Sequence, residues 1–192
     1  ILEEIYANHA ENNPRICRMT PTEAEITKIA LNCFLTTKIA YANMVGDIVK
    51  SVGGNPDVVL NAVGQDTRIG NKYLGYGYGY GGPCFPRDNR ALAIYAKDLG
   101  VEALISLASD ASNRKHLDYQ IKEYVKNNDK NKKVVFEYVT YKPESTLLVE
   151  SQQLAFAVGI AKEGFDVVVR ERPEVVKELT SKYGDLFTYE EK

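Results

Sequence analysis

Cys84 has the clearest chemical potential in this 192-residue chain, within Gly82-Pro83-Cys84-Phe85-Pro86-Arg87-Asp88. It lies just before a predicted helix, and a helix N-terminus with a nearby arginine favours the nucleophilic thiolate form of cysteine. A lone cysteine can also be a plain small hydrophobic residue. The glycine-rich segment before Cys84 and the charged residues after it favour the nucleophile.

Lys28 and Asn32 form a second candidate pair, because residues four apart on a helix share one face. A lysine beside an amide could hold an oxyanion, although a solvated surface pair explains the same spacing. Cys33 falls in an apolar stripe and is predicted to be a core residue, and Cys17 is predicted to be an exposed thiol.

The two histidines, His9 and His116, lie in polar surroundings without metal-ligand spacing to the cysteines. We interpret both as surface residues and predict no metal site.

Residues 64–82 hold seven of the 14 glycines, interleaved with tyrosines, and glycine lets a backbone approach a ligand closely. The stretch 77–82 matches G-x-G-x-x-G. A dinucleotide fingerprint needs a strand before the glycines and a helix opening from them, whereas Tyr and Gly precede this stretch and Pro83 follows it. We therefore reject the match.

These residues need elements to position them. Thr20-Pro21-Thr22-Glu23 is a capping box that starts a helix over residues 21–52, about 45 Å long. Its apolar positions spread widely around the helix, so we expect other helices to wrap it, those of a second subunit among them. Further helices are predicted over 55–64, 88–99 and 102–126.

The helical pattern of the sequence ends at the polar segment 127–132, which we interpret as a linker. Strands are then predicted at 134–136 and 167–169, with helices over 152–162 and 173–183. The fold class predicted is a mostly α central domain built on one long helix, followed by a truncated α/β, Rossmann-like domain with a parallel sheet. The expected ranges are a helical domain at 1–126, a linker at 127–132 and a partial α/β domain at 133–192.

Composition excludes several classes of protein. With 24 Lys and Arg against 26 Asp and Glu, the net charge of −2 argues against a nucleic-acid-binding protein. No apolar run is long enough to cross a bilayer, and three scattered cysteines fit a reducing cytoplasm. The chain begins at Ile1, without Met, in a stretch typical of the inside of a helix, so we expect a piece of something larger.

Four motifs resemble the UDP-glucose/GDP-mannose dehydrogenase family. They are Thr20-Pro21-Thr22-Glu23-Ala24-Glu25-Ile26-Thr27-Lys28, Ala30-Leu31-Asn32-Cys33-Phe34-Leu35, Asp66-Thr67-Arg68-Ile69-Gly70 and Gly79-Tyr80-Gly81-Gly82-Pro83-Cys84-Phe85-Pro86-Arg87-Asp88. The resemblance covers the family's central domain over about residues 1–125. It implies that 1–126 is a substrate-binding and dimerisation domain and that 133–192 is a partial nucleotide-sugar-binding domain. Thr140-Tyr141-Lys142-Pro143 with Glu150-Ser151 resembles the opening of its C-terminal nucleotide-sugar domain.

The resemblance implies an NAD-dependent enzyme that oxidises a sugar CH₂OH to a carboxylate in two steps. Cys84 would form a thiohemiacetal and then a thioester. Lys28 and Asn32 would stabilise the oxyanion, and Asp88 would assist proton transfer. NAD would be bound mainly by a domain absent from this chain; the cofactor-binding residues are unknown, and the region near Arg87 is the one candidate.

The resemblance also implies substrate contacts. The loop Gly75, Tyr76, Gly77, Tyr78, Gly79, Tyr80, Gly81 would wrap a nucleotide sugar, with Tyr80 packed on it. Arg68 would reach a nucleotide sugar on the partner of a homodimer formed through the helix 21–52. Tyr141 and Lys142 would close over the sugar. Arg68-Ile69-Gly70 followed by Asn71-Lys72-Tyr73-Leu74 favours UDP-glucose over GDP-mannose.

The chain departs from the family pattern at three places. Pro83 stands where Ser is common, which removes one backbone N–H beside the nucleophile. Val149 replaces the Arg of an Arg-Glu-Ser motif that contacts the cofactor, and Glu137-Tyr138-Val139 replaces a glycine-containing turn. The family's N-terminal Rossmann domain, with its NAD fingerprint, is also absent from these 192 residues, so we expect no NAD reduction by this chain alone. The alternatives are a non-catalytic nucleotide-sugar-binding dimerisation module and a thiol hydrolase or redox protein built on Cys84.

Overall fold

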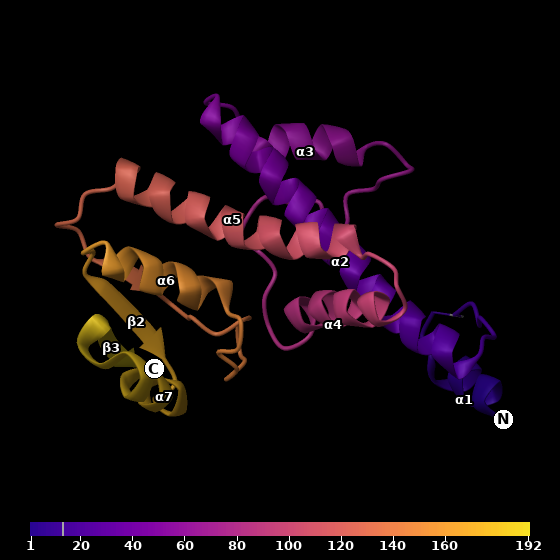
Figure 1. Ribbon diagram of the computed structural model, residues 1–192. Coiled ribbons are helices and arrows are strands. Elements are labelled where there is room, and N and C mark those ends of the chain that lie inside the picture. Colours follow the sequence, from indigo (N-terminus) through magenta and orange to yellow (C-terminus); the bar gives the residue numbers. More distant parts are fainter. Residues whose placement is uncertain (13) are drawn as a thin grey trace.

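The computed structural model describes residues 1–12 and 14–192 and shows a helical part and a smaller α/β part (Figure 1). The elements in chain order are α1 (Leu2–His9), α2 (Pro21–Ser51), α3 (Pro56–Gly64), α4 (Phe85–Asp98), α5 (Leu104–Asn127), β1 (Val134–Phe136), α6 (Gln152–Lys162), β2 (Val167–Glu171), α7 (Pro173–Tyr183), the 3-10 turn η1 (Gly184–Leu186) and β3 (Thr188–Glu191).

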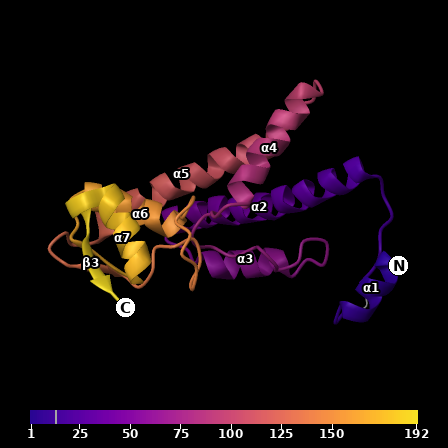
Figure 2. The ribbon, with the colours of Figure 1, turned by 90° about the horizontal axis from the view of Figure 1, so that it is seen from below.

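Helix α2 is the axis of the helical part, and its predicted start is confirmed. The Thr20 backbone N–H donates to Glu23 Oε2 at 2.6 Å, and the Glu23 N–H donates to Thr20 Oγ1 at 3.3 Å. Helices α3, α4 and α5 contact α2, with α3 on the side opposite α4 (Figures 1 and 2). Helix α1 lies beyond the N-terminal end of α2, away from the α/β part.

The cover on α2 is incomplete. Thr36, Ala40 and Ala42 are buried, whereas Phe34 is 66% exposed and Ile48 is 60% exposed. Leu31 and Tyr41 are exposed as well. Within the described chain, α2 therefore keeps an apolar stripe that no other element covers.

The α/β part is a parallel sheet in the order β1-β2-β3, with Val134 paired to Val167 and Val168 paired to Thr188. Val167 and Val169 pack in one core with Ile160 of α6. Leu179 of α7 lies in the same core. The predicted fold class is confirmed, including both helices of this part at their predicted bounds.

Two elements, α4 and β3, differ most from the sequence prediction. Helix α4 begins at Phe85 rather than at Asp88, because Pro86 fits the first helical turn, where its missing N–H is not needed. Strand β3 was not predicted, since Thr188–Glu191 is largely polar and has no apolar run to mark a buried strand.

Helix α5 belongs to both parts of the chain. It packs on α2 and α4, and its residues Ile121 and Tyr124 pack against the core of the α/β part. Gly159 of α6 leaves the space that the Ile121 side chain fills. The polar segment 127–132 follows α5, but the domain boundary placed there stays a prediction.

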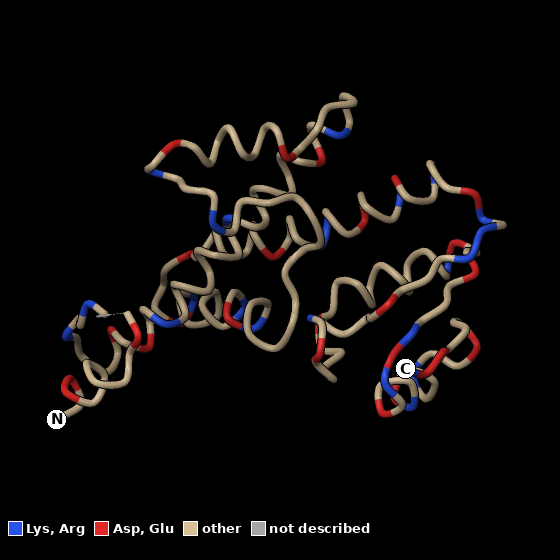
Figure 3. The backbone as a smooth tube through the Cα atoms, turned by 180° about the vertical axis from the view of Figure 1, so that it is seen from behind, with Lys and Arg blue, Asp and Glu red and all other residues tan. Residues whose placement is uncertain are grey.

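Acidic and basic residues alternate along the backbone without separating into regions of one sign (Figure 3). Across residues 1–12 and 14–192, no helix combines the length and apolar character needed to cross a membrane. The same residues contain no group of three or more His, Cys, Asp or Glu side chains placed to hold a metal ion.

Candidate active site

Asp88 is the centre of the first candidate site. Its Oδ2 accepts hydrogen bonds from Lys28 Nζ at 2.6 Å and from Asn32 Nδ2 at 2.7 Å. Its Oδ1 accepts from Arg87 Nε at 3.1 Å and Nη2 at 3.0 Å. The shared helical face predicted for Lys28 and Asn32 is therefore confirmed, and both side chains converge on one carboxylate from α4.

The electrostatics of Asp88 follow from this geometry. The residue is 2% exposed. Burial acts to raise the pKa of this carboxyl, but hydrogen bonds from Lys28, Asn32 and Arg87 outweigh it and lower the pKa below its ordinary value. Asp88 is thus an ionised carboxylate that holds a lysine and an amide in fixed positions.

Cys84 lies one turn before Asp88, at the N-cap of α4, and its thiol is exposed. The Asp88 backbone N–H donates to the Cys84 carbonyl oxygen at 2.8 Å. The pKa of Arg87 is raised above its ordinary value, mainly by its hydrogen bonds to Asp88 and to a smaller extent by the neighbouring Cys84 thiol. The structure therefore brings Cys84, Arg87 and Asp88 together at one helix N-terminus.

Helix α4 is fixed to α2 by buried polar contacts beside this site. Asn89 Nδ2 donates to Thr36 Oγ1 at 2.8 Å and to the Phe85 carbonyl oxygen at 3.0 Å. Cys33, one turn before Thr36 on α2, is 5% exposed, and burial raises the pKa of its thiol. Its predicted core role is confirmed, as is the exposure of Cys17.

A hollow of about 540 Å³ opens beside the Asp88 cluster. Lys28, Ile29, Arg87 and Asp88 line it, so the charged atoms of the cluster border a space that a small molecule could enter. Cys84 and Asn32 are not among the residues that line this hollow. The thiol stands at the N-cap of the helix whose Asp88 holds the lysine and the amide, and these three kinds of group are the ones that addition at a carbonyl carbon uses.

The glycine-rich loop is the second candidate site, and α2 and α5 hold it by its backbone. Asn43 Oδ1 accepts from the Gly77 N–H at 3.0 Å. Asn113 Oδ1 accepts from the Tyr80 N–H and Asn113 Nδ2 donates to the Tyr80 carbonyl oxygen, both at 2.9 Å. Two amide side chains from different helices thus fix the path of this loop.

His116 corrects the sequence prediction, which placed it on the surface. Its side chain is 2% exposed. Nδ1 lies 2.8 Å from Asp47 Oδ2, and Nε2 lies 2.7 Å from the Gly77 carbonyl oxygen. The polar residues around His116 in the sequence misled the prediction, because α5 turns Asn113, His116 and Gln120 inward toward the loop. Their spacing of three and four residues was the signal that could have revealed this.

The α/β part forms the other wall of the loop. The Tyr141 ring fills the space beside Gly82, whose φ is +79°, and the Glu150 backbone lies against Gly81. A hollow of about 230 Å³ is bordered there by residues of both parts: Tyr78, Gly79, Gly81, Tyr138, Tyr141, Lys142, Pro143, Gln152 and Gln153. Five predicted substrate-binding residues, Tyr78, Gly79, Gly81, Tyr141 and Lys142, therefore meet at one hollow.

Two tyrosines of the loop point elsewhere. Tyr80 is 3% exposed and packs edge-on against Phe85, so its ring does not offer the ligand surface that was expected. The Tyr76 hydroxyl donates to Asp47 Oδ1 at 2.9 Å, and its ring packs on Gly46 of α2. Packing against α2, α4 and α5 determines where these two tyrosine rings point. The alternation of Gly and Tyr in the sequence does not predict that packing.

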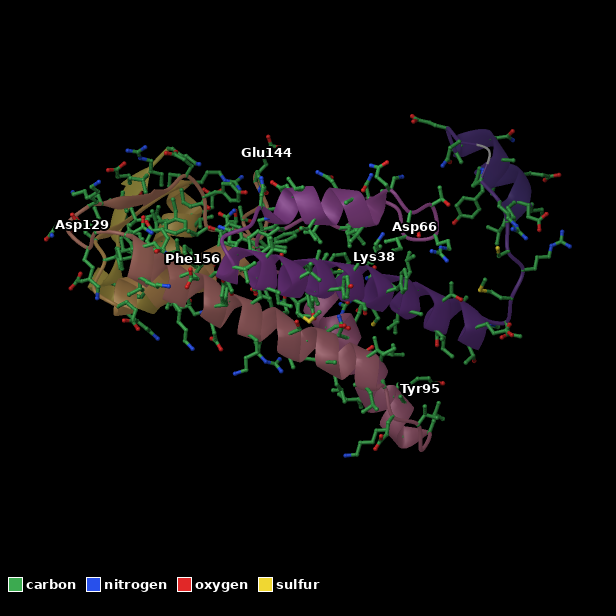
Figure 4. All side chains as sticks on the ribbon, turned by 90° about the horizontal axis from the view of Figure 1, so that it is seen from above. Lys38, Asp66, Tyr95, Asp129, Glu144 and Phe156 are labelled. Atoms are coloured by element: carbon green, nitrogen blue, oxygen red, sulfur yellow. The ribbon has the colours of Figure 1, made fainter. Side chains whose placement is uncertain are left out.

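Arg68 lies apart from both hollows, in the turn after α3. Its Nη2 donates to Asp66 Oδ2 at 2.6 Å, and its side chain is 86% exposed. Lys38 of α2 secures this turn by donating to the carbonyl oxygens of Ile69 at 3.0 Å and Gly70 at 3.2 Å. Figure 4 shows Lys38 and Asp66 on the same side of α2.

The turn after β1 does not fit a dinucleotide. In such domains a glycine-rich turn offers backbone N–H groups to a pyrophosphate. Here the Val139 and Thr140 N–H groups donate to Glu171 Oε1 at 2.9 Å and 3.3 Å. Glu171 is 2% exposed, so the protein's own carboxylate takes the position of a bound anion.

The sequence and the structure of this chain were both compared with those of known proteins, and the two comparisons agree on one family. Residues 22–115 match the central domain of the UDP-glucose/GDP-mannose dehydrogenase family. The UDP-glucose 6-dehydrogenase of Pseudomonas aeruginosa is 32% identical over 169 residues, which cover 86% of this chain and 37% of that protein. The UDP-glucose 6-dehydrogenase AglM of Haloferax volcanii is 30% identical over 191 residues, covering 96% of this chain and 44% of that protein.

Solved structures agree with the sequence relatives. A UDP-glucose dehydrogenase from the archaeon Pyrobaculum islandicum superposes with a TM-score of 0.83 at 33% identity, covering 100% of this chain and 44% of that one. A GDP-mannose dehydrogenase from Pseudomonas aeruginosa gives a TM-score of 0.53 at 26% identity, covering 98% of this chain and 45% of that one. The chain thus spans less than half the length of these relatives. It belongs to the UDP-glucose/GDP-mannose dehydrogenase family, whose central domain it carries at residues 22–115.

Proposed function

We propose that this chain is the substrate-binding and dimerisation part of an NAD-dependent nucleotide-sugar 6-dehydrogenase that converts UDP-glucose to UDP-glucuronate. The observation that carries the proposal is the convergence of Lys28 and Asn32 on Asp88, one helical turn after the exposed Cys84. The relatives named UDP-glucose 6-dehydrogenase support the choice of substrate.

The chemistry would centre on Cys84. The sugar alcohol is first oxidised to an aldehyde, and the Cys84 thiolate adds to its carbon, forming a C–S bond and an oxyanion that takes up a proton. Oxidation of this thiohemiacetal gives a thioester. Attack by water then breaks the C–S bond, releasing the carboxylate and the thiolate.

The surrounding residues would stabilise these steps. Lys28 and Asn32 would donate to the oxyanion and orient the hydrolytic water, because Asp88 already holds both donors in place. Asp88 would take part in the proton transfers. Tyr78, Tyr141 and Lys142 would contact the nucleotide sugar at the hollow that they share.

NAD⁺, when bound, would supply the hydride acceptor for both oxidations. Glu171 occupies the amides of the β1 turn, and Val149 replaces an arginine, so the α/β part of this chain offers it no cradle. We therefore propose that the cofactor is bound outside the part of the fold described here.

Dimerisation would use the exposed stripe on α2. Leu31, Phe34, Tyr41 and Ile48 lie along one helix and are each at least half exposed, which is a large apolar surface to leave in water. Arg68 would then reach a nucleotide sugar on the partner. Three free cysteines support a reducing, cytoplasmic location.

The test is binding and turnover with the same chain. Calorimetry should show binding of UDP-glucose in preference to GDP-mannose, while NADH formation should be absent. Binding of neither nucleotide sugar, or appreciable NADH formation by this chain, would overturn the proposal. In a full-length enzyme that contains this chain, Cys84→Ser should block turnover and spare binding; retained oxidation would remove Cys84 from the mechanism.

The second candidate is a nucleotide-sugar-binding dimerisation module without catalysis. The Glu171 carboxylate favours it, because it already accepts from the backbone N–H groups that a turn after β1 would offer to a phosphate. The in-frame sequence upstream of the Ile1 codon distinguishes the two. A strand–Gly-x-Gly-x-x-Gly–helix unit there supports the dehydrogenase, and a start or stop codon immediately before Ile1 supports the module.

A further inference from the structure

One ion pair connects the helical part of the chain to the α/β part. Arg90 of α4 donates from Nη1 to Glu150 Oε1 at 2.8 Å, and Glu150 lies in the turn before α6. In the part of the chain that the structure describes, no other ion pair crosses between the two parts. Arg90 follows soon after Asp88 on the same helix, so the pair connects the helix of the Asp88 cluster directly to this turn.

Arg90 is itself held in place from α5. Its Nε lies 3.7 Å from Asp110 Oδ2, and Arg114 Nη1 donates to the same carboxylate oxygen. Asp110 is 9% exposed, so its position is fixed by the packing of α5. The hydrogen bond to Glu150 raises the pKa of Arg90 above its ordinary value. The guanidinium is therefore shared by two acidic residues, one on α5 and one in the α/β part.

The backbone of Glu150 distinguishes this ion pair from an ordinary surface pair, which stabilises a protein only slightly. Glu150 has a φ of +53°. It is the third residue of a turn that the Ser151 N–H closes by donating to the Leu148 carbonyl oxygen at 3.2 Å. A positive φ at that position favours glycine, so a glutamate needs stabilising contacts to keep this conformation. The ion pair with Arg90 is such a contact.

The same turn forms part of the wall between the two parts of the chain. The Glu150 carbonyl oxygen lies against Gly81 so closely that a side chain at position 81 would not fit. Ser151 is anchored on the other side, because its hydroxyl donates to the Val139 carbonyl oxygen at 2.7 Å. A movement of the Glu150 backbone would therefore change the hollow of about 230 Å³ that Gly81 and Tyr141 border.

We propose that Arg90 and Glu150 are positioning residues. Their ion pair keeps the turn before α6 in its positive-φ conformation against the glycine-rich loop, which sets the shape of the hollow. Both residues act through the backbone of this turn, because neither is among the residues that border the hollow. The proposal rests on the proposed function, because this hollow is where the nucleotide sugar is expected to bind.

Hydrogen exchange of the Ser151 amide tests the effect on the turn without any ligand. Arg90→Met and Glu150→Ala should each lower its protection by about threefold. Glu150→Gly also removes the ion pair, but glycine suits the positive φ, so this variant should retain the protection. The control is Arg170→Gln, which removes a similarly exposed guanidinium from ion pairs inside the α/β part and should have no effect. Unchanged protection in Arg90→Met and Glu150→Ala would refute the proposal, as would an equal loss in Glu150→Gly.

Calorimetry with UDP-glucose tests the link from the turn to the hollow. Arg90→Met and Glu150→Ala should each weaken binding by about threefold, and the double variant should weaken it no further, because either change alone removes the pair. Glu150→Gly and Arg170→Gln should bind as the unaltered chain does. Losses that multiply to about ninefold in the double variant would overturn the proposal. Equal loss in Glu150→Gly would do the same, since the turn would then not be the cause.

The two measurements keep this proposal apart from the proposed function. If the unaltered chain does not bind UDP-glucose, the proposed function fails, and hydrogen exchange still decides whether the ion pair holds the turn. If the protection of Ser151 falls while every variant binds UDP-glucose equally well, the link to the hollow is rejected. In a full-length enzyme that contains this chain, Arg90→Met should raise KM and leave kcat unchanged; a lower kcat at an unchanged KM would contradict a role in binding.

Discussion

Removing the Asn113 side chain should destabilise the protein strongly, because it satisfies both backbone groups of Tyr80. Its two hydrogen bonds are 2.9 Å long, and Asn113 and Tyr80 are 6% and 3% exposed. Water cannot replace the lost partners at that depth. A buried polar group left unpaired costs about 1–3 kcal/mol, so two of them in Asn113→Ala predict a loss of about 3 kcal/mol.

Urea denaturation followed by circular dichroism measures this loss, and the helical content of the chain gives a strong signal in the absence of tryptophan. With a slope of about 2 kcal/mol per molar urea, the midpoint should fall by about 1.5 M. Asn128→Ala is the matched control, since Asn128 is exposed and donates only to the Tyr124 carbonyl oxygen. That variant should change stability by about 0.5 kcal/mol at most.

Asn113→Asp separates the two hydrogen bonds. A carboxylate keeps the acceptor for the Tyr80 N–H but sets an oxygen against the Tyr80 carbonyl, so this variant should be no more stable than Asn113→Ala. A midpoint within about 0.3 M of the unaltered chain for either variant would refute the view that Asn113 anchors the loop.

Three further results are expected. Hydrogen bonds lower the pKa of Asp88 in the folded chain, so its carboxylate stabilises the fold at any pH above its ordinary pKa of 3.8. This stability is lost as the pH falls through the lower pKa of the folded chain. Acid unfolding of Asp88→Asn, followed by circular dichroism, should therefore show a shallower pH dependence than that of the unaltered chain. Gly82→Ala should cost about 1–2 kcal/mol in urea because of its φ of +79°, whereas Gly75→Ala, with open space around it, should cost less than half of that. Cys84 should react with Ellman's reagent in the folded chain, and Cys33 only on unfolding; equal rates would contradict the burial.

The fold was largely predictable from the sequence because its signals are local. The capping box at Thr20, the proline at the start of α7 and the apolar runs of β1 and β2 each act within a few residues. Strand β3 lacks such a signal, since a polar edge strand is defined by its partner rather than by its own residues.

The candidate site was predictable only in part. Lys28 and Asn32 were identifiable because helical spacing places them on one face, yet their meeting with Asp88 depends on how α4 docks on α2. His116 and Asn113 were missed for the same reason. Their polar side chains match a solvent-exposed helix until the glycine-rich loop is packed against them.

The contacts that fix the path of the glycine-rich loop are made to its backbone, so they do not depend on the side chains that the loop presents to a ligand. The hydrogen bonds come from Asn43, Asn113 and His116 and go to N–H and carbonyl groups of the backbone. These groups are the same whatever side chain a loop residue carries. Tyr78, which borders the hollow shared with Tyr141, can therefore be exchanged without altering any of those contacts. Directed evolution of the proposed nucleotide-sugar specificity would thus vary the side chains that border this hollow and leave unchanged the residues that hold the backbone.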